Sequence, residues 1–134
     1  MALTNEYKAG LFDGEGYVGI YLKKRSHNIR VVIGLTDPRP LAFLHAEYGG
    51  SLWTKHYDNP NHRPFTSWYL TGSKVIQFLM DVQPFLVVKA EQVALALEFR
   101  SMQTGRQVRK ISEETFGVHE DYRQRLMALK HLRT

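Results

Sequence analysis

The sequence contains no cysteine. Disulfides, thiolate zinc sites and cysteine nucleophiles are therefore excluded, and any metal ion must bind to oxygen or imidazole ligands. The sequence also has no apolar run near the roughly 20 residues that span a bilayer, and its first residues do not follow the signal-peptide pattern. We therefore expect no membrane partner and a reducing intracellular location, in a bacterial cytoplasm or in an organelle such as a chloroplast or mitochondrion.

Acidic residues are the minority among the charges, because 13 Asp and Glu face 18 Lys and Arg and leave a net charge of +5. Such an excess on a small domain favours a polyanionic partner, nucleic acid among others. With 134 residues, of which 43% are hydrophobic, the chain is long enough for one packed domain and too short for two ordinary ones. Phosphate-binding glycine loops and the Gly-x-Ser-x-Gly elbow are missing, which argues against nucleotide hydrolysis and acyl transfer.

Hydrophobic periodicity predicts an α+β fold in the order helix, two strands, helix, two strands, helices. A short helix begins at Thr4 or Asn5 and ends near the glycines at 14 and 16. Alternation predicts strands at 17–25 and 29–35 around a turn at 26–28, and at 51–57 and 65–71 around a polar loop. Further helices are expected at about 37–48, 75–82, 90–102 and 112–132. We expect one antiparallel sheet with its helices on one face.

The helix-free face of this sheet is predicted to bind DNA. Its polar and basic side chains supply donors and acceptors that suit base edges in the major groove. A strand of about nine residues spans roughly 30 Å, or about nine base pairs. The predicted contacts are Tyr21, Lys23, Arg25, His27, Asn28 and Arg30 on the first hairpin, and Thr54, His56, Ser67, Tyr69 and Thr71 on the second.

The first helix carries a further signal, since Gly10 and Gly14 are four residues apart and an acid, Glu15, follows. Helices with this spacing of small residues can pack with their backbones nearly touching. Two copies packed about a two-fold axis would bring both Glu15 carboxylates together at the negative ends of their helices. Mg²⁺ suits such a site, because it binds one or two carboxylates together with phosphate oxygens and water.

The stretch Lys8-Ala9-Gly10-Leu11-Phe12-Asp13-Gly14-Glu15-Gly16 resembles the motif of the LAGLIDADG homing endonucleases, with Lys8 in place of the first leucine. The resemblance implies an αββαββα fold with a saddle-shaped sheet and additional C-terminal helices. It also implies a site-specific DNA endonuclease that uses Mg²⁺ or another divalent metal such as Mn²⁺. One motif copy implies a homodimer, whose two copies would cover a long pseudo-palindromic target of roughly 18 to 22 base pairs. The metal site would comprise Glu15 and Gly14, and the dimer interface Ala9, Gly10, Asp13 and Gly14. For Asp13 we favour a structural role, bonding backbone near the interface.

A second segment, Gln83-Pro84-Phe85-Leu86-Val87-Val88-Lys89-Ala90-Glu91-Gln92, resembles the family's Pro-Phe/Tyr-Leu-x-x-Lys-x-x-Gln stretch and implies that Lys89 is the active-site lysine. By the same likeness Asp37 takes the place of a catalytic residue that positions water. We expect one domain at 1–134, with a core at about 4–102 and a helical extension at about 103–134. The family likeness further implies a staggered double-strand cut with short 3′ overhangs and a link to intron mobility.

Several alternatives remain open from the sequence. The chain could be a non-cleaving relative, either an RNA maturase or a DNA-binding regulator, or a basic RNA-associated module without an active site. Gly10 and Gly14 could instead let the helix approach the sheet of its own chain. Gly19-Ile20-Tyr21 and Val32-Ile33-Gly34 resemble the two halves of a GIY-YIG nuclease motif, although the second half lacks its tyrosine. The histidines match no standard zinc spacing.

Overall fold

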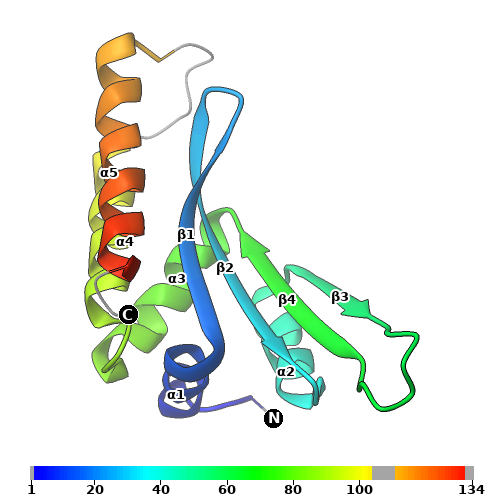
Figure 1. Cartoon of the computed structure of the whole chain (residues 1–134). Coiled ribbons are helices and arrows are strands. Elements are labelled where there is room, and N and C mark those ends of the chain that lie inside the picture. Colours follow the sequence, from blue (N-terminus) through cyan, green and yellow to red (C-terminus); the bar gives the residue numbers. More distant parts are fainter. Residues whose placement is uncertain (1, 104–110, 132–134) are drawn as a thin grey trace.

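The computed structural model describes residues 2–103 and 111–131 and has an α+β fold (Figure 1). Its four strands form one sheet in the order β1-β2-β4-β3, and all paired strands are antiparallel. The elements in chain order are α1 (Asn5–Glu15), β1 (Gly16–Lys23), β2 (Ser26–Leu35), α2 (Arg39–Tyr48), β3 (Ser51–Lys55), β4 (Phe65–Thr71), α3 (Ser73–Val82), the 3₁₀ helix η1 (Gln83–Phe85), α4 (Ala90–Met102) and α5 (Glu113–His131). The predicted fold class is confirmed.

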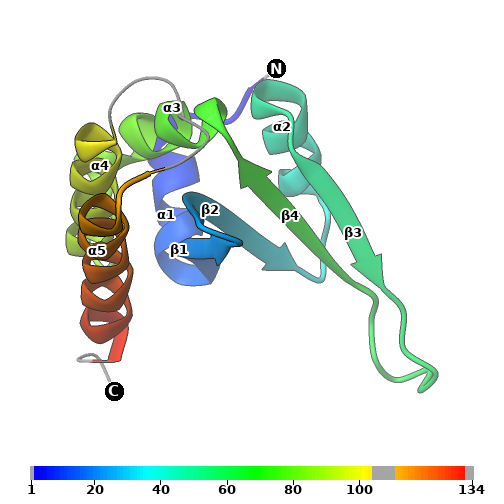
Figure 2. The ribbon, with the colours of Figure 1, turned by 90° about the horizontal axis from the view of Figure 1, so that it is seen from above.

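The helices leave one face of the sheet uncovered. Figure 2 shows α2 and α3 on one side of the sheet, with α4 and α5 beside its β1 edge. The core lies between the sheet and these helices, and Phe12, Ile33, Trp68 and Phe78 are fully buried in it. Among the described residues, no helix combines the length and the apolar character needed to cross a membrane.

Helix α1 begins at its predicted cap, since the Thr4 Oγ1 accepts a hydrogen bond of 3.1 Å from the backbone N–H of Tyr7. Lys8, which stands where the motif has leucine, is buried in the core and is 1% exposed. Its Nζ donates to both carboxylate oxygens of Glu47 at 3.0 Å and to the Tyr48 Oη at 2.7 Å. The buried charge is therefore paired and hydrogen-bonded, as burial requires.

The first hairpin has a shorter turn than predicted. Lys23 pairs with Ser26, so only Lys24 and Arg25 form the turn, and Lys24 adopts a left-handed φ of 58°. The predicted turn at 26–28 was wrong, because a two-residue turn lets the ladder start at once on the other side. Arg25 consequently lies in the turn and not in a strand.

The second hairpin and the C-terminal helix follow the prediction with small differences. Strand β4 has its predicted bounds, whereas β3 ends at Lys55 and leaves His56 outside the sheet. The helix η1, which the periodicity did not predict, connects α3 to the segment before α4. Helix α5 packs on α4 and on β1. Residue 132, where the last helix was predicted to end, lies outside the described residues.

Candidate active site and nucleic-acid interface

Glu15 is the last residue of α1, at the junction where Gly16 starts β1. Its side chain is exposed, and within residues 2–103 and 111–131 no hydrogen bond or ion pair engages it. The helix macrodipole places partial negative charge at this end. An exposed carboxylate that no described residue engages, at this end of a helix, is suited to bind a cation.

Asp13 and Lys89 connect this end of α1 to the start of α4. The Asp13 carboxylate accepts hydrogen bonds from the backbone N–H groups of Val87, Val88 and Lys89 at 2.7, 3.1 and 2.9 Å. The Lys89 Nζ donates in return to the Asp13 carbonyl oxygen at 2.7 Å. Partial burial alone would raise the pKa of Asp13, but the three N–H donors and the charge of Lys89 hold it below its usual value. Asp13 is thus an ionised cap in its own chain.

The outer face of α1 carries the two glycines. A Cβ built on Gly10 or on Gly14 would meet no atom within 4 Å, so neither glycine is needed for packing inside the described chain. Both residues are exposed, as is Tyr7, at 50%. The alternative that these glycines bring α1 close to its own sheet is therefore excluded, and the helix presents a smooth, open strip to the outside.

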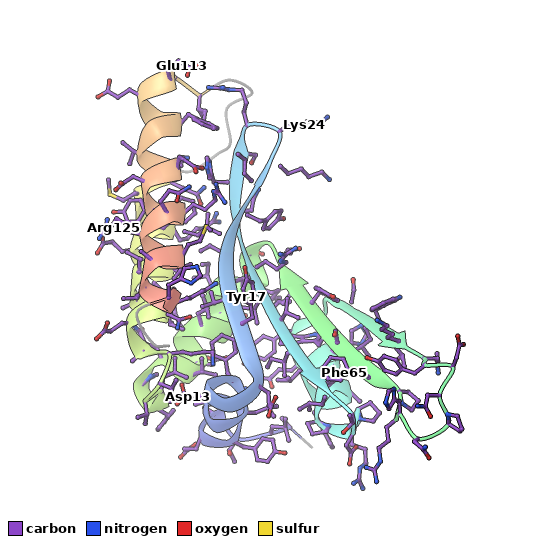
Figure 3. All side chains as sticks on the ribbon, in the orientation of Figure 1. Asp13, Tyr17, Lys24, Phe65, Glu113 and Arg125 are labelled. Atoms are coloured by element: carbon purple, nitrogen blue, oxygen red, sulfur yellow. The ribbon has the colours of Figure 1, made fainter. Side chains whose placement is uncertain are left out.

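The uncovered face of the sheet combines aromatic, polar and basic side chains. The strand register aligns Gly19 with Arg30 and Thr71, and Tyr17 with Val32 and Tyr69. The Arg30 guanidinium carbon lies 5.2 Å from the Tyr21 ring centroid and 6.0 Å from that of Tyr17. Figure 3 labels Lys24 at the hairpin tip and Asp13 at the opposite end, so this face extends from the β1–β2 turn to the end of α1.

No described group of three or more His, Asp or Glu residues could hold a metal ion by itself. Among the described residues the chain has a single uncommitted carboxylate at the end of α1, because Asp13 is engaged by the start of α4. A metal site here would need further oxygen ligands from outside the chain, such as a second copy and a phosphate.

No family model matches the sequence, and no curated protein matches it either. Solved structures do. The homing endonuclease I-CvuI, in complex with its target in the presence of 2 mM Ca, superposes with a TM-score of 0.58 at 15% identity over 91% of this chain and 93% of that chain. The archaeal intron-encoded homing endonuclease I-Vdi141I, complexed with DNA, gives 0.56 at 15% identity over 88% and 95%. This chain has the LAGLIDADG homing endonuclease fold.

The meganuclease I-SmaMI, bound to uncleavable DNA, has the same fold in a longer chain. It superposes with a TM-score of 0.67 at 14% identity over 87% of this chain but only 42% of that chain. The predicted resemblance is thus confirmed for the LAGLIDADG fold, in which α1 carries the motif and ends at Glu15.

Four residues of the predicted DNA-binding set are not where the sequence put them. His27 is 1% exposed on the helix side of the sheet, with its Nε2 2.8 Å from the Glu120 Oε1. Thr54 lies opposite Thr66 on that same side of the sheet, where the side chains of Trp68 and Leu70 also lie. The hydroxyl oxygens of Thr54 and Thr66 are 2.9 Å apart. His56 lies beyond the end of β3, and Arg25 is bound to α5 through Glu113 at 2.8 Å.

The remaining predicted contacts, Tyr21, Lys23, Asn28, Arg30, Ser67, Tyr69 and Thr71, share the uncovered face, although Ser67 is only 8% exposed. The same face holds side chains that the prediction missed: Tyr17, Ser51, Trp53 and Lys55. Trp53 is 58% exposed. The pairing register of β3 with β4 identifies the β3 residues on this face, because Trp53 lies opposite Ser67 and directly paired residues share a face.

Two further predictions need correction or qualification. Ala9 is 1% exposed and packs in the core of its own chain, so it does not belong to the open strip of α1 as predicted. Asp37 lies just beyond β2 and binds Arg39 through both carboxylate oxygens at 2.6 to 3.1 Å. The hydrogen bonds from Arg39 lower the pKa of Asp37 to about 2. Asp37 is therefore ionised and paired with Arg39, and its role in positioning water stays a prediction.

Proposed function

We propose that this protein is a site-specific DNA endonuclease that acts as a homodimer and depends on a divalent metal ion bound by Glu15. The observation that carries the proposal is the exposed Glu15 carboxylate, which no described residue engages and which ends a helix with an open glycine strip. The uncovered sheet face beside it carries cations and hydrogen-bonding groups suited to DNA.

The homodimer is supported by the surface of α1 and by chain lengths. Two copies joined along Gly10 and Gly14 would bring their Glu15 residues together, which supplies the second carboxylate that one chain lacks. The short neighbours I-CvuI and I-Vdi141I are covered over 93% and 95% of their chains, whereas I-SmaMI is covered over 42%. One copy of this chain therefore matches less than half of the longer enzyme, as expected if two copies replace it.

The oxygen donors at this site fit Mg²⁺ or Mn²⁺, and the DNA complexes of I-CvuI were obtained in 2 mM Ca and in 2 mM Mg. A divalent ion bound here supplies charge stabilisation and lowers the pKa of coordinated water. Glu15 would hold the ion, with the carbonyl of Gly14 as a further oxygen donor. Lys89, fixed to the Asp13 carbonyl at 2.7 Å, keeps a positive charge beside the end of α1, where it would stabilise charge on the scissile phosphate.

Target recognition would come from the uncovered sheet face. Tyr21, Asn28 and Tyr69 lie on three neighbouring strands and would read base edges in the major groove, while Lys23 would contact phosphates. Two copies would read a long, roughly two-fold symmetric site. We further propose that the double-strand cut leaves short 3′ overhangs and serves intron mobility inside a bacterial cell or an organelle.

The test is selection of cleaved sites from a randomised duplex library by the purified protein in Mg²⁺. The expected result is a pseudo-palindromic target of roughly 18 to 22 base pairs, cut only when divalent metal is present. The variant Glu15→Gln, selected in parallel, should bind the same target and leave it intact. Binding without cleavage by the native chain would indicate instead a regulator or maturase that uses the same surface.

A further inference from the structure

Helix α5 forms a pocket with the edge of the sheet. It lies along β1 and extends beyond the layer of α2 and α3, from Glu113 near the hairpin tip toward the end of α1 (Figures 1–3). Between α5 and β1 lies a pocket of about 410 Å³, lined among others by Tyr17, Tyr21, Arg30, Arg123, Met127 and Lys130. Tyr21 and Arg30 belong to the predicted DNA contacts, whereas the residues that α5 contributes, Arg123, Met127 and Lys130, do not. We call the whole cavity the β1–α5 pocket.

Three cationic side chains, those of Arg30, Arg123 and Lys130, line the β1–α5 pocket, and only that of Arg123 forms an ion pair with a described carboxylate. Arg123 is neutralised by Glu120, which accepts hydrogen bonds from its guanidinium at 2.7 to 3.2 Å. No carboxylate among residues 2–103 and 111–131 forms an ion pair with Arg30 or Lys130. The Arg30 Nε is buried and has no hydrogen-bond partner in the described chain. A buried, unsatisfied donor of a charged group is costly unless a ligand completes it.

Aromatic rings, not acids, hold these two cations in place. The Lys130 Nζ lies 3.7 Å from the centroid of the Tyr17 ring, and Arg30 lies over the rings of Tyr21 and Tyr17. Gly19 makes room for this arrangement, because a Cβ there would come within 2.3 Å of the Tyr17 Oη. A cation–π contact positions a charge without accepting hydrogen bonds from all its N–H groups. Arg30 and Lys130 therefore retain donors for an anion.

We infer that the β1–α5 pocket binds a phosphate group of the DNA backbone close to the point of cleavage, with Arg30 and Lys130 as its donors. The inference rests on the proposed function and extends it by assigning α5 a part in DNA binding. Tyr17 is two residues from Glu15, which places the pocket near the metal-binding end of α1. Burial, with the charges of Arg30 and Lys89, lowers the pKa of Lys130 to about 8. An anion in the pocket would relieve this repulsion.

The test compares Lys130→Met with Lys74→Met, which removes the same charge from an exposed residue of α3 on the helix side. Binding of the selected target is measured without divalent metal at several salt concentrations. Lys130→Met should lower the affinity about tenfold and reduce the slope of log affinity against log salt by about 1. Lys74→Met should change neither quantity, and Lys130→Arg should restore both. Thermal unfolding of each variant verifies that it is folded.

The outcomes separate this inference from the proposed function. If the native chain neither binds nor cuts DNA, the proposed function fails. If the native chain binds and cuts but the Lys130→Met and Lys74→Met slopes agree, the pocket inference alone is overturned. Inorganic phosphate, titrated into the native chain and into Lys130→Met, distinguishes a free anion from the DNA backbone. Phosphate binding that depends on Lys130, together with an unchanged DNA slope, would make this a free-anion site and also overturn the inference.

Discussion

Asp13 and Lys89 bind each other twice through different atoms: the Asp13 carboxylate accepts the backbone N–H of Lys89 at 2.9 Å, and the Lys89 Nζ donates to the Asp13 carbonyl at 2.7 Å. The first contact caps the start of α4, and the second satisfies a carbonyl at the end of α1. Both helix ends therefore depend on one residue pair. The arrangement fixes the lysine beside Glu15 without using the Glu15 carboxylate.

Replacing Asp13 by alanine should destabilise the protein by about 2 kcal/mol, because the N–H groups of Val87, Val88 and Lys89 lose their acceptor. Urea unfolding monitored by circular dichroism measures this change. Asp121→Ala is the matched control, since Asp121 is exposed on α5, and it should shift stability by less than about 0.5 kcal/mol. Equal effects of the two substitutions would refute the capping role.

The same residue gives a pH dependence. The pKa of Asp13 is lowered in the folded chain. Its contribution to the free energy of unfolding is therefore fully present above the unfolded pKa of about 3.9, and is lost as the pH falls through the lower folded pKa. The stability difference between the native chain and Asp13→Ala should therefore shrink below pH 4. A difference that stays constant down to pH 2 would contradict this.

Glu15→Gln should reduce cleavage in Mg²⁺ by at least roughly 100-fold, because the amide keeps the shape of the side chain but loses the charge that we propose to hold the ion. DNA affinity without metal should change little. Glu6→Gln alters an exposed acid in the first turn of the same helix and serves as the control. Normal cutting by Glu15→Gln combined with loss of cutting in Tyr21→Phe would favour the GIY-YIG alternative instead.

Gly10→Leu should convert the proposed homodimer to a monomer, since a bulky side chain would keep two α1 helices apart. Within one chain the new side chain would meet open space, so the monomer should be no less stable than before. Light scattering gives the mass. Gly117→Leu is the control, because Gly117 lies in α5 and is equally open. A native chain that is already monomeric would remove the basis of the two-fold metal site.

Glu47→Ala should cost about 3 kcal/mol, because it leaves the charge of Lys8 buried beside Tyr48 without its carboxylate. Adding Lys8→Met should recover most of this loss, since an apolar chain of similar length then fills the same space. Thermal unfolding of the two single variants and the double variant completes the cycle. Simple additivity of the two changes would show that Lys8 and Glu47 are not coupled.

Local patterns predicted the parts of the site that depend on neighbouring residues. The Thr4 cap, the end of α1 and the place of Glu15 follow from short-range hydrogen bonding and glycine, and the structure has them as expected. The alternation of Val18 and Ile20 likewise predicted which face of β1 is buried. These features are determined by interactions between residues of the same turn or strand, so the local sequence is enough to predict them.

The errors arise where distant segments decide the outcome. His27 continues the buried face of β2, but only the packing of α5, with Phe116 and His119 against the imidazole, makes that position an interior one. Trp53 and Thr54 exchanged their expected faces because β3 is short and its alternation is weak, so its pairing with β4 fixes the phase. The local pattern indicates neither the packing of α5 on β2 nor the register of β3 with β4. The β1–α5 pocket was unpredictable for the same reason.

The charge of Lys130 should change within the physiological range. Burial and the nearby charges of Arg30 and Lys89 lower its pKa to about 8, and Arg123 also faces the pocket, so the ammonium is lost as the pH rises through 8 in the free protein. An ordinary lysine stays charged to about pH 10.4. DNA affinity should therefore fall between pH 7 and pH 9, whereas Lys130→Arg should keep a flat profile because arginine does not titrate there. Carbon NMR of the lysine side chains locates the midpoint. A Lys130 midpoint near 10 would exclude this mechanism, whatever the affinity does.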